Sequence, residues 1–153
     1  MMKHFTTILL LMLGLSAFFE SNAQCKVFTK EHCFTQLDGY INTGSYNGAV
    51  MTEGEEATLT QTFYEGQEYR LVVCTQESLA DIVFFEIINF NDEVIFSSQE
   101  SGTNIFDFSI ESTQMLKIRV KAPHTDRGSA PKKNGCISIV VGFKGTTNNV
   151  TSN

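Results

Sequence analysis

The sequence predicts an all-β protein: an antiparallel β-sandwich or jelly roll of about seven strands. A short disulfide-linked N-terminal segment is expected to precede it. Three observations predict this fold. From Ala57 onward, apolar and polar residues alternate with a period of two. β-Branched and aromatic residues, including many of the 13 Phe, fill these stretches. Turns such as Glu65-Gly66, Asn91-Asp92 and Ser112-Thr113 divide them into short segments.

Composition narrows the function classes. The 153 residues carry 11 Lys and Arg against 17 Asp and Glu, a formal net charge of −6. This acidic balance argues against a general nucleic-acid binder, which needs basic residues to displace counterions from phosphates. An apolar content of 42% argues against intrinsic disorder. The length fits one domain.

Residues 1–23 are predicted to be a secretory signal peptide. Lys3 and His4 form a short basic start, and an apolar run follows from Ile8 to Phe19. The run is shorter than the roughly 20 residues of a membrane span. Ser21-Asn22-Ala23 then supplies small residues at the cleavage positions. We therefore expect an exported protein, periplasmic, on the outer surface or secreted, with no transmembrane segment after signal removal. A retained anchor and a lipidated Cys25 are the alternatives.

The four cysteines indicate disulfides, because an even count is typical of an exported chain. Four cysteines allow three pairings. Cys74 ends one apolar segment and Cys136 begins another, so antiparallel neighbouring strands would bring this pair within bridging distance. Cys25 and Cys33 would then close a small local loop. A zinc site is disfavoured by the spacing, since no cysteine pair has the C-x2–4-C form.

The predicted domain organisation has an irregular segment over residues 24–48, a β-sandwich domain over 49–145 and a flexible tail over 146–153. Polar, turn-rich stretches fill the first segment. Thr29 to Leu37 is compatible with one or two helical turns, with Thr29 as the cap. Beyond Gly145 the residues are small and polar, which is typical of a frayed end.

The first predicted strands lie on either side of a turn at Glu65-Gly66. Ala57, Leu59 and Phe63 share one face of the first, and Tyr69, Leu71 and Val73 share one face of the second. Residues 81–90 (DIVFFEIINF) are apolar on both faces except at Glu86, which predicts a central strand. Asn91-Asp92 supplies a turn, and residues 93–97 return as the next strand.

Residues 106–121 are predicted to form a hairpin. Its first strand places Phe106, Phe108 and Ile110 on one face, opposite the acidic Asp107 and Glu111. Its second strand places Leu116, Ile118 and Val120 on one face and a basic stripe on the other: Lys117, Arg119 and Lys121. Matching the apolar faces would set the acidic side of one strand against this stripe. We expect that partner to neutralise the stripe.

The last predicted strand runs from Cys136 to Lys144. Ile137, Ile139, Val141 and Phe143 line one face, and Gly142 faces the other way, which marks a bulge or a close contact. The loop over residues 122–135 precedes it and contains both prolines. Its polar side chains are candidate contact residues: His124, Arg127, Lys132 and Lys133.

The segments YEGQEYRLVVC, DIVFFEIINFNDEVIF, FDFSIESTQMLKIRV and GCISIVVGFK together resemble a group of small exported Bacteroidota β-sandwich proteins of unassigned function. The layout is more distantly similar to pre-peptidase C-terminal-type sandwich modules. The resemblance implies a sandwich fold, an exported location and no catalytic residues.

The sequence contains only weak signals of a catalytic or metal-binding site. The chain contains neither a G-x-S-x-G nor an H-E-x-x-H motif. A Cys33–His124 catalytic pair has no support in the sequence. The acidic residues near the first strands are expected to form a solvated face rather than a glycosidase pair: Glu53, Glu55, Glu56, Glu65 and Glu68. A calcium site at the turn over residues 89–93 is a minor alternative. We expect no catalytic residue, no cofactor and no metal.

The sequence therefore favours a non-catalytic exported β-sandwich protein with a structural or binding role in the cell envelope. The alternative is a saccharide- or peptide-binding module, for which Tyr40, Tyr46 and Tyr64 are the candidate ligand-binding residues because they fall near turns. An unknown envelope protein or a surface glycan is the expected partner, and an enzyme is the least favoured class.

Overall fold

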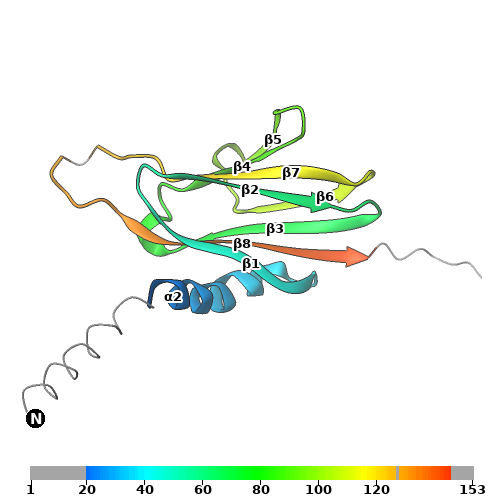
Figure 1. The fold of residues 1–153 in the computed structure, drawn as a ribbon, viewed down its shortest axis with the longest axis horizontal. Helices are drawn as coiled ribbons and strands as arrows, with labels where there is room; N and C mark the ends of the chain where they lie inside the picture. Colours follow the sequence, from blue (N-terminus) through cyan, green and yellow to red (C-terminus); the bar gives the residue numbers. More distant parts are fainter. Residues whose placement is uncertain (1–19, 127, 146–153) are drawn as a thin grey trace, which may run out of the picture.

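In the computed structural model, which describes residues 20–126 and 128–145, two four-stranded antiparallel sheets pack face to face (Figure 1). The first sheet has the order β1-β8-β3-β6 and the second the order β2-β7-β4-β5. The strands are β1 (Ile41–Thr52), β2 (Glu56–Phe63), β3 (Gln67–Thr75), β4 (Phe84–Ile88), β5 (Val94–Ser97), β6 (Ile105–Ile110), β7 (Gln114–Lys121) and β8 (Asn134–Gly145). This architecture confirms the predicted all-β antiparallel sandwich.

The main core lies between the two sheets, where the inward residues of each strand meet. Ile137, Ile139 and Val141 of β8 are buried in it, as the period of two predicted. Phe63 is fully buried, with its ring edge-on to Tyr69 at 4.9 Å and to Phe108 at 5.0 Å between centroids. Edge-to-face aromatic pairs of this kind add about 0.5–1.5 kcal/mol beyond their buried area.

The β4–β5 hairpin forms where the sequence predicted it. The Asn89 Oδ1 atom accepts hydrogen bonds from the backbone N–H groups of Asn91 and Glu93, both at 2.9 Å. Asp92 takes a left-handed φ of 62° in the same turn. β4 lies between β7 and β5, although it starts at Phe84 rather than at residue 81. The preceding residues form the short helix η4 (Glu77–Leu79) and a turn instead.

The predicted hairpin over residues 106–121 is wrong. β6 pairs with β3 in the first sheet, whereas β7 pairs with β2 and β4 in the second. The turn between β6 and β7 therefore crosses from one sheet to the other. The link between β2 and β3 at Glu65-Gly66 crosses in the same way. In a sandwich both strands still direct their apolar faces inward after such a crossing, so the alternation of apolar residues is equally compatible with either connection.

The prediction of an irregular segment over residues 24–48 needs correction as well. The chain is helical through α2 (Glu20–Phe28), η2 (Thr29–Cys33) and η3 (Phe34–Leu37), so Thr29 lies within the helical segment and is not its cap. Residues 41–48 belong to β1, which pairs with β8 and has an irregular register between Asn42 and Tyr46. β1 is an edge strand in which apolar residues such as Ile41 and Val50 are exposed, so its sequence shows little apolar–polar alternation.

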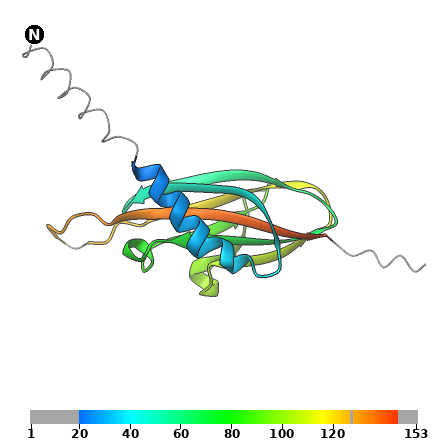
Figure 2. The same ribbon diagram turned by 90° about the horizontal axis from the view of Figure 1, so that it is seen from below.

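The helical segment from α2 to η3 forms a third layer on the outer face of the first sheet (Figure 2). A smaller core, here called the outer core, lies beneath it and consists of Cys33, Leu37, Val72, Cys74 and Val140. Phe28, Phe34, Tyr40, Tyr46 and Ile105 pack against its rim. None of the helices that the structure describes is long and apolar enough to cross a membrane. The predicted signal peptide lies mostly, and the predicted tail wholly, outside the described residues.

Gly142 marks the closest approach between β8 and the helical layer. A Cβ atom placed there would lie 2.7 Å from the Tyr40 Cβ and 3.1 Å from a Leu37 methyl group. The close contact predicted for this glycine is therefore present, and no other residue fits without moving the layer.

We expect Gly142→Val to destabilise the fold by about 1–3 kcal/mol, because overpacking displaces the helical layer. Urea denaturation would measure the change. The matched control is Ser109→Val, which adds bulk at an exposed position on the same outer face. An unchanged unfolding midpoint for Gly142→Val would contradict the assigned contact.

Candidate functional site

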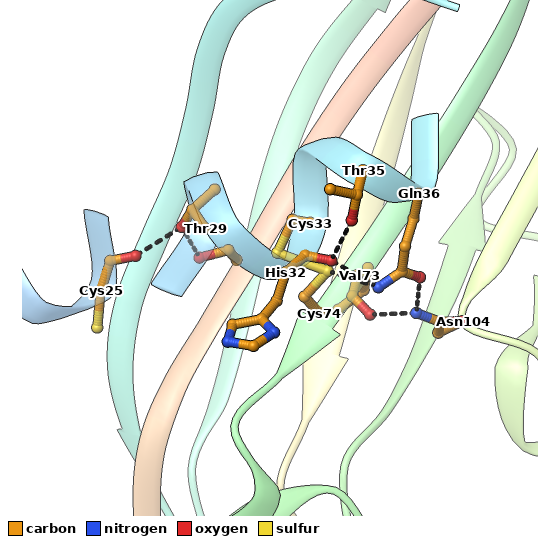
Figure 3. Close-up of a disulfide and its surroundings, with 10 residues drawn as sticks. Cys25, Thr29, His32, Cys33, Thr35, Gln36, Val73, Cys74 and Asn104 are labelled. Carbon is orange, nitrogen blue, oxygen red and sulfur yellow. Dashed lines mark hydrogen bonds between the residues drawn. A yellow bond between two sulfur atoms is a disulfide. The ribbon is translucent and has the colours of Figure 1, made fainter. Parts of the chain in front are cut away.

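Two disulfides attach the helical segment to the first sheet: Cys25–Cys136 and Cys33–Cys74 (the second is shown in Figure 3). The predicted pairing, Cys74 with Cys136 and Cys25 with Cys33, is wrong. β3 and β8 are indeed antiparallel neighbours, but Cys74 lies opposite Ser138, two residues along from Cys136. Both cysteines direct their side chains outward, where the helical segment supplies a partner for each.

A signal for this pairing is present in the sequence. Cys25, Thr29, Cys33 and Leu37 recur every four residues and are all buried, as expected for one face of a helix. The hydroxyl groups of Thr29 and Ser138 hydrogen-bond at 2.5 Å between the two disulfides. The Thr29 hydroxyl donates to the Cys25 carbonyl at 2.7 Å, so the Ser138 hydroxyl donates to Thr29.

A cleft lies beside the Cys33–Cys74 bridge, with a volume of about 590 Å³; we call it the disulfide-side cleft. The helical segment supplies one wall, and the end of β3 with η4 supplies the other. Its lining residues are Phe28, His32, Gln36, Cys74, Thr75, Gln76, Glu77, Ala80 and Asn104.

The Gln36 amide fixes one corner of this cleft (Figure 3). Its Nε2 donates to the His32 carbonyl at 2.9 Å and to the Cys74 sulfur at 3.5 Å. Its Oε1 accepts from the Asn104 Nδ2 at 2.9 Å, and that nitrogen also donates to the Val73 carbonyl at 3.3 Å. Side chains from the helical segment and from the turn before β6 are thereby held at fixed positions.

A second hollow, here called the edge groove, opens where the edge strands β1 and β2 face each other. It has a volume of about 200 Å³ and is lined by Asn47, Gly48, Ala49, Met51, Ala57, Thr58, Leu59, Val120, Ile137 and Ile139. The floor is core residues from β7 and β8, while the mouth carries the exposed Ala49 and Ala57. Small side chains at the mouth leave the core accessible from this side.

The described residues of the loop between β7 and β8 project beyond the ends of the sheets (Figure 1), and Glu53 holds the base of this loop. The Glu53 carboxylate accepts hydrogen bonds from the backbone and hydroxyl of Thr125 and, at 3.1 Å, from the backbone N–H of Lys133. Glu53 is only 1% exposed, so its place in a solvated acidic face is a wrong prediction. The other four glutamates of that group are exposed, as expected.

The predicted loop contacts have different surroundings. His124 is 64% exposed, with its Nδ1 3.6 Å from the Glu53 carboxylate. Lys132 is exposed. Lys133 forms an ion pair with Asp81 at 2.8 Å, which fastens the loop to the turn after η4. Arg127 lies outside the described residues.

The basic stripe of β7 is neutralised, but not by β6. Arg119 and Lys121 pair with Glu86 of β4 at 3.4 and 3.1 Å. Lys117 pairs with Asp92 at 2.6 Å, and this hydrogen bond lowers the pKa of the Asp92 carboxyl below its ordinary value. In the turn that was a minor calcium candidate, Asn89 Oδ1, Asp92 Oδ1 and Glu93 Oε2 each accept a hydrogen bond from a protein group.

Asp107 of β6 pairs with Arg70 of β3 through two hydrogen bonds, at 2.8 and 2.7 Å. The bond from Arg70 lowers the pKa of the Asp107 carboxyl. The Arg70 guanidinium lies 4.7 Å from the centroid of the Tyr40 ring, and the Lys144 ammonium lies 4.1 Å from it. Burial raises the pKa of the Tyr40 phenol.

The structure does not gather the three candidate tyrosines into one surface. Tyr40 and Tyr46 pack against the outer core, and the Tyr40 ring is already in contact with two cations. Tyr64 lies at the β2–β3 link and is 60% exposed. Their role as ligand-binding residues stays a prediction. The cleft residues Gln36, Gln76 and Asn104 were not singled out, because amide side chains carry no sequence pattern of their own.

Cys33 and Cys74 are both oxidised, and all four cysteines are in disulfides. Over residues 20–126 and 128–145, no group of three or more His, Cys, Asp and Glu side chains has the arrangement to hold a metal ion.

Peptide mapping under non-reducing conditions should recover two cross-linked peptides, one with Cys25 and Cys136 and one with Cys33 and Cys74. Mass spectrometry of a proteolytic digest, prepared at acidic pH to stop exchange, would measure them. Recovery of a Cys74–Cys136 peptide would contradict the observed arrangement.

Glu53→Ala should destabilise the protein by about 2 kcal/mol, because it leaves part-buried donors of Thr125 and Lys133 without their acceptor. Hydrogen exchange at these two amides should accelerate. Glu56→Ala, at an exposed position nearby, serves as the control and should stay within about 0.5 kcal/mol of the wild type. Equal effects of the two substitutions would contradict the role given to Glu53.

Comparisons with known proteins identify no family for this chain. No protein-family model and no curated protein matches it. Among solved structures, it is similar to the crystal structure of Aeromonas hydrophila PliG, a periplasmic lysozyme inhibitor of g-type lysozyme. The TM-score is 0.48 and the identity 12%, over 70% of this chain and 90% of that chain. A similarity of this size carries no inference about binding, and the resemblance to small exported Bacteroidota proteins stays a prediction.

Proposed function

We propose that this chain is an exported, non-catalytic binding protein of the cell envelope, which takes up an extended segment of a partner protein along the edge formed by β1 and β2. The observation that carries the proposal is an uncharged edge strand beside an apolar groove. The two disulfides support the exported location, because such bonds form and persist in oxidising compartments.

The edge of β1 is unusual in lacking protection. Edge strands expose unpaired backbone donors and acceptors, and proteins commonly protect them with charged residues or proline. β1 spans twelve residues without a charged residue or a proline. β2, the facing edge, has Glu56 as its single charged residue. Near the ends of β1, the Gly44 N–H donates to Asn42 Oδ1 at 2.8 Å and the Thr52 N–H to the Glu55 carboxylate at 2.7 Å. Between these two residues β1 carries no charged side chain that would repel an added strand.

The edge groove explains how such a strand would be selected. Its volume of about 200 Å³ is smaller than the roughly 300–1,000 Å³ typical of small-molecule sites. A cavity of about 150 Å³ nevertheless holds a benzene-sized group, as an engineered protein cavity demonstrates. The groove therefore suits an aliphatic or aromatic side chain of a bound peptide. Backbone pairing would supply affinity and this side chain would supply specificity, which is the usual division in strand addition.

Ala49→Lys should abolish partner binding, because it places a charge at the mouth of the groove while the exposed position spares the fold. The assay is capture of envelope proteins by the oxidised chain, followed by cross-linking and by hydrogen exchange of the β1 amides with the purified partner. Ala130→Lys, in the exposed loop, is the matched control.

The expected result is a partner whose cross-links map to β1, whose binding protects the β1 amides and which Ala49→Lys no longer captures. A partner that binds both lysine variants equally, with no protection along β1, would contradict the proposal.

A further inference from the structure

From the disulfide-side cleft we infer a second binding site, which takes a neutral saccharide. It is separate from the edge groove, since the two hollows share no lining residue. The inference rests on the chemistry of the lining side chains, on their unused hydrogen-bonding capacity and on the rigidity of the walls.

The cleft has the size of a small-ligand site. Its volume of about 590 Å³ lies within the range of about 300–1,000 Å³ that ligand pockets occupy. The residues come from three parts of the chain: the helical segment, the end of β3 with η4, and the turn before β6. Sites assembled from separate elements in this way present polar groups in several directions to one ligand.

The lining side chains match the chemistry of sugar hydroxyl groups. Each hydroxyl is both a donor and an acceptor, and the amides of Gln36, Gln76 and Asn104 likewise offer both functions. Glu77 adds a carboxylate acceptor and Thr75 a hydroxyl. Phe28 and His32, with ring centroids 5.2 Å apart, supply flat apolar surface for the C–H face of a sugar ring.

Much of this capacity is not used within the described part of the chain. The Gln76 Oε1 accepts from the backbone N–H of Cys136 at 3.0 Å, while its Nε2 has no hydrogen bond. Asn104 donates through its Nδ2, which leaves its Oδ1 available. The Glu77 carboxylate and the His32 ring make no hydrogen bond to other described residues. A ligand therefore meets an acceptor from Asn104, a donor from Gln76 and a carboxylate at the rim.

The charge of the cleft selects against anionic ligands. None of the lining residues that the structure describes is Lys or Arg, and Glu77 contributes a negative charge. Phosphate and sulfate groups are normally held by basic side chains or backbone N–H groups, so phosphorylated and sulfated ligands fit poorly. A purely apolar ligand would leave the amides without partners at a cost in free energy. A neutral polyhydroxylated ligand carries no negative charge and also supplies hydrogen-bond partners for the amides.

The walls are held in place before any ligand arrives. The Cys33–Cys74 bridge joins the helical segment to β3, and the hydrogen bonds of Gln36 and Asn104 tie that segment to the turn before β6. The side chains of Gln36 and Asn104 therefore lose little conformational entropy on binding, which favours affinity. A low entropy cost is important for sugar binding, because each protein–sugar hydrogen bond replaces hydrogen bonds to water and gains little net free energy.

A glycan array probed with the oxidised, folded chain tests the inference, and calorimetry with the best neutral oligosaccharide then measures affinity. Glu77→Ala and His32→Ala should each weaken binding by about tenfold or more, because each removes a direct contact. Both residues are exposed, so the fold should survive, and circular dichroism would verify it.

The control variants are Lys30→Ala, on the helical segment outside the cleft, and Glu111→Ala, at the β6–β7 turn. Both should keep full affinity for the oligosaccharide. Ala49→Lys should keep it too, which would distinguish the cleft from the edge groove. An array without neutral hits, hits restricted to sulfated or phosphorylated glycans, or binding unchanged by Glu77→Ala and His32→Ala would each overturn the inference.

Discussion

The covalent attachment of the helical segment to β8 and β3 is the constraint on which the rest of the structure depends. The bridges span 111 and 41 residues of sequence. In the chain-entropy model, closing loops of these lengths restricts the unfolded chain by about 4–5 kcal/mol for each bridge taken alone. A local Cys25–Cys33 bridge would have closed a loop of only a few residues, worth about 2.5 kcal/mol. The observed pairing therefore constrains the chain more, and it joins the helical layer to the two central strands of the first sheet.

The helical layer also covers apolar side chains on the outer face of the first sheet. The outward faces of β3 and β8 carry Val72, Cys74 and Val140, which would otherwise contact water. Covering them with Cys33 and Leu37 creates a second, smaller core on the outside of the sandwich. The close approach at Gly142 and the Thr29–Ser138 hydrogen bond fix the position of the helical layer on β8. The walls of the disulfide-side cleft and the position of Tyr40 follow from this fit.

Sequence reasoning predicted local features and missed several that depend on distant contacts. The strand faces of β8 and the β4–β5 turn were predictable, because alternation and Asn-Asp turn chemistry act over a few residues. The β6–β7 hairpin was wrong because the same alternation fits a crossing between sheets. The basic stripe of β7 was consequently assigned to β6, whereas Glu86 and Asp92 neutralise it. Charge pairing follows sheet order, and the sequence contains little information about that order.

Glu53 and the cysteines show the same limit at the level of single side chains. Nothing in the residues around Glu53 distinguishes it from the exposed Glu55 and Glu56, because its burial depends on a loop some 70 residues further on. The cysteine pairing depended on seeing Cys25, Thr29 and Cys33 as one helical stripe rather than as parts of an irregular segment. Once that stripe is placed over β3 and β8, the partners follow from geometry: Cys136, Ser138 and Cys74 all face it.

The same attachment separates the two proposed binding surfaces. Cys25 of the helical segment is bonded to β8 and Cys33 to β3, so the segment lies on the outer face of the first sheet. The cleft forms on the β3 side of the segment, and the groove opens at the opposite edge, between β1 and β2. A glycan in the first would not obstruct a strand along the second. The fold could therefore hold a saccharide and a protein at once, as an envelope protein that links the two would need to do.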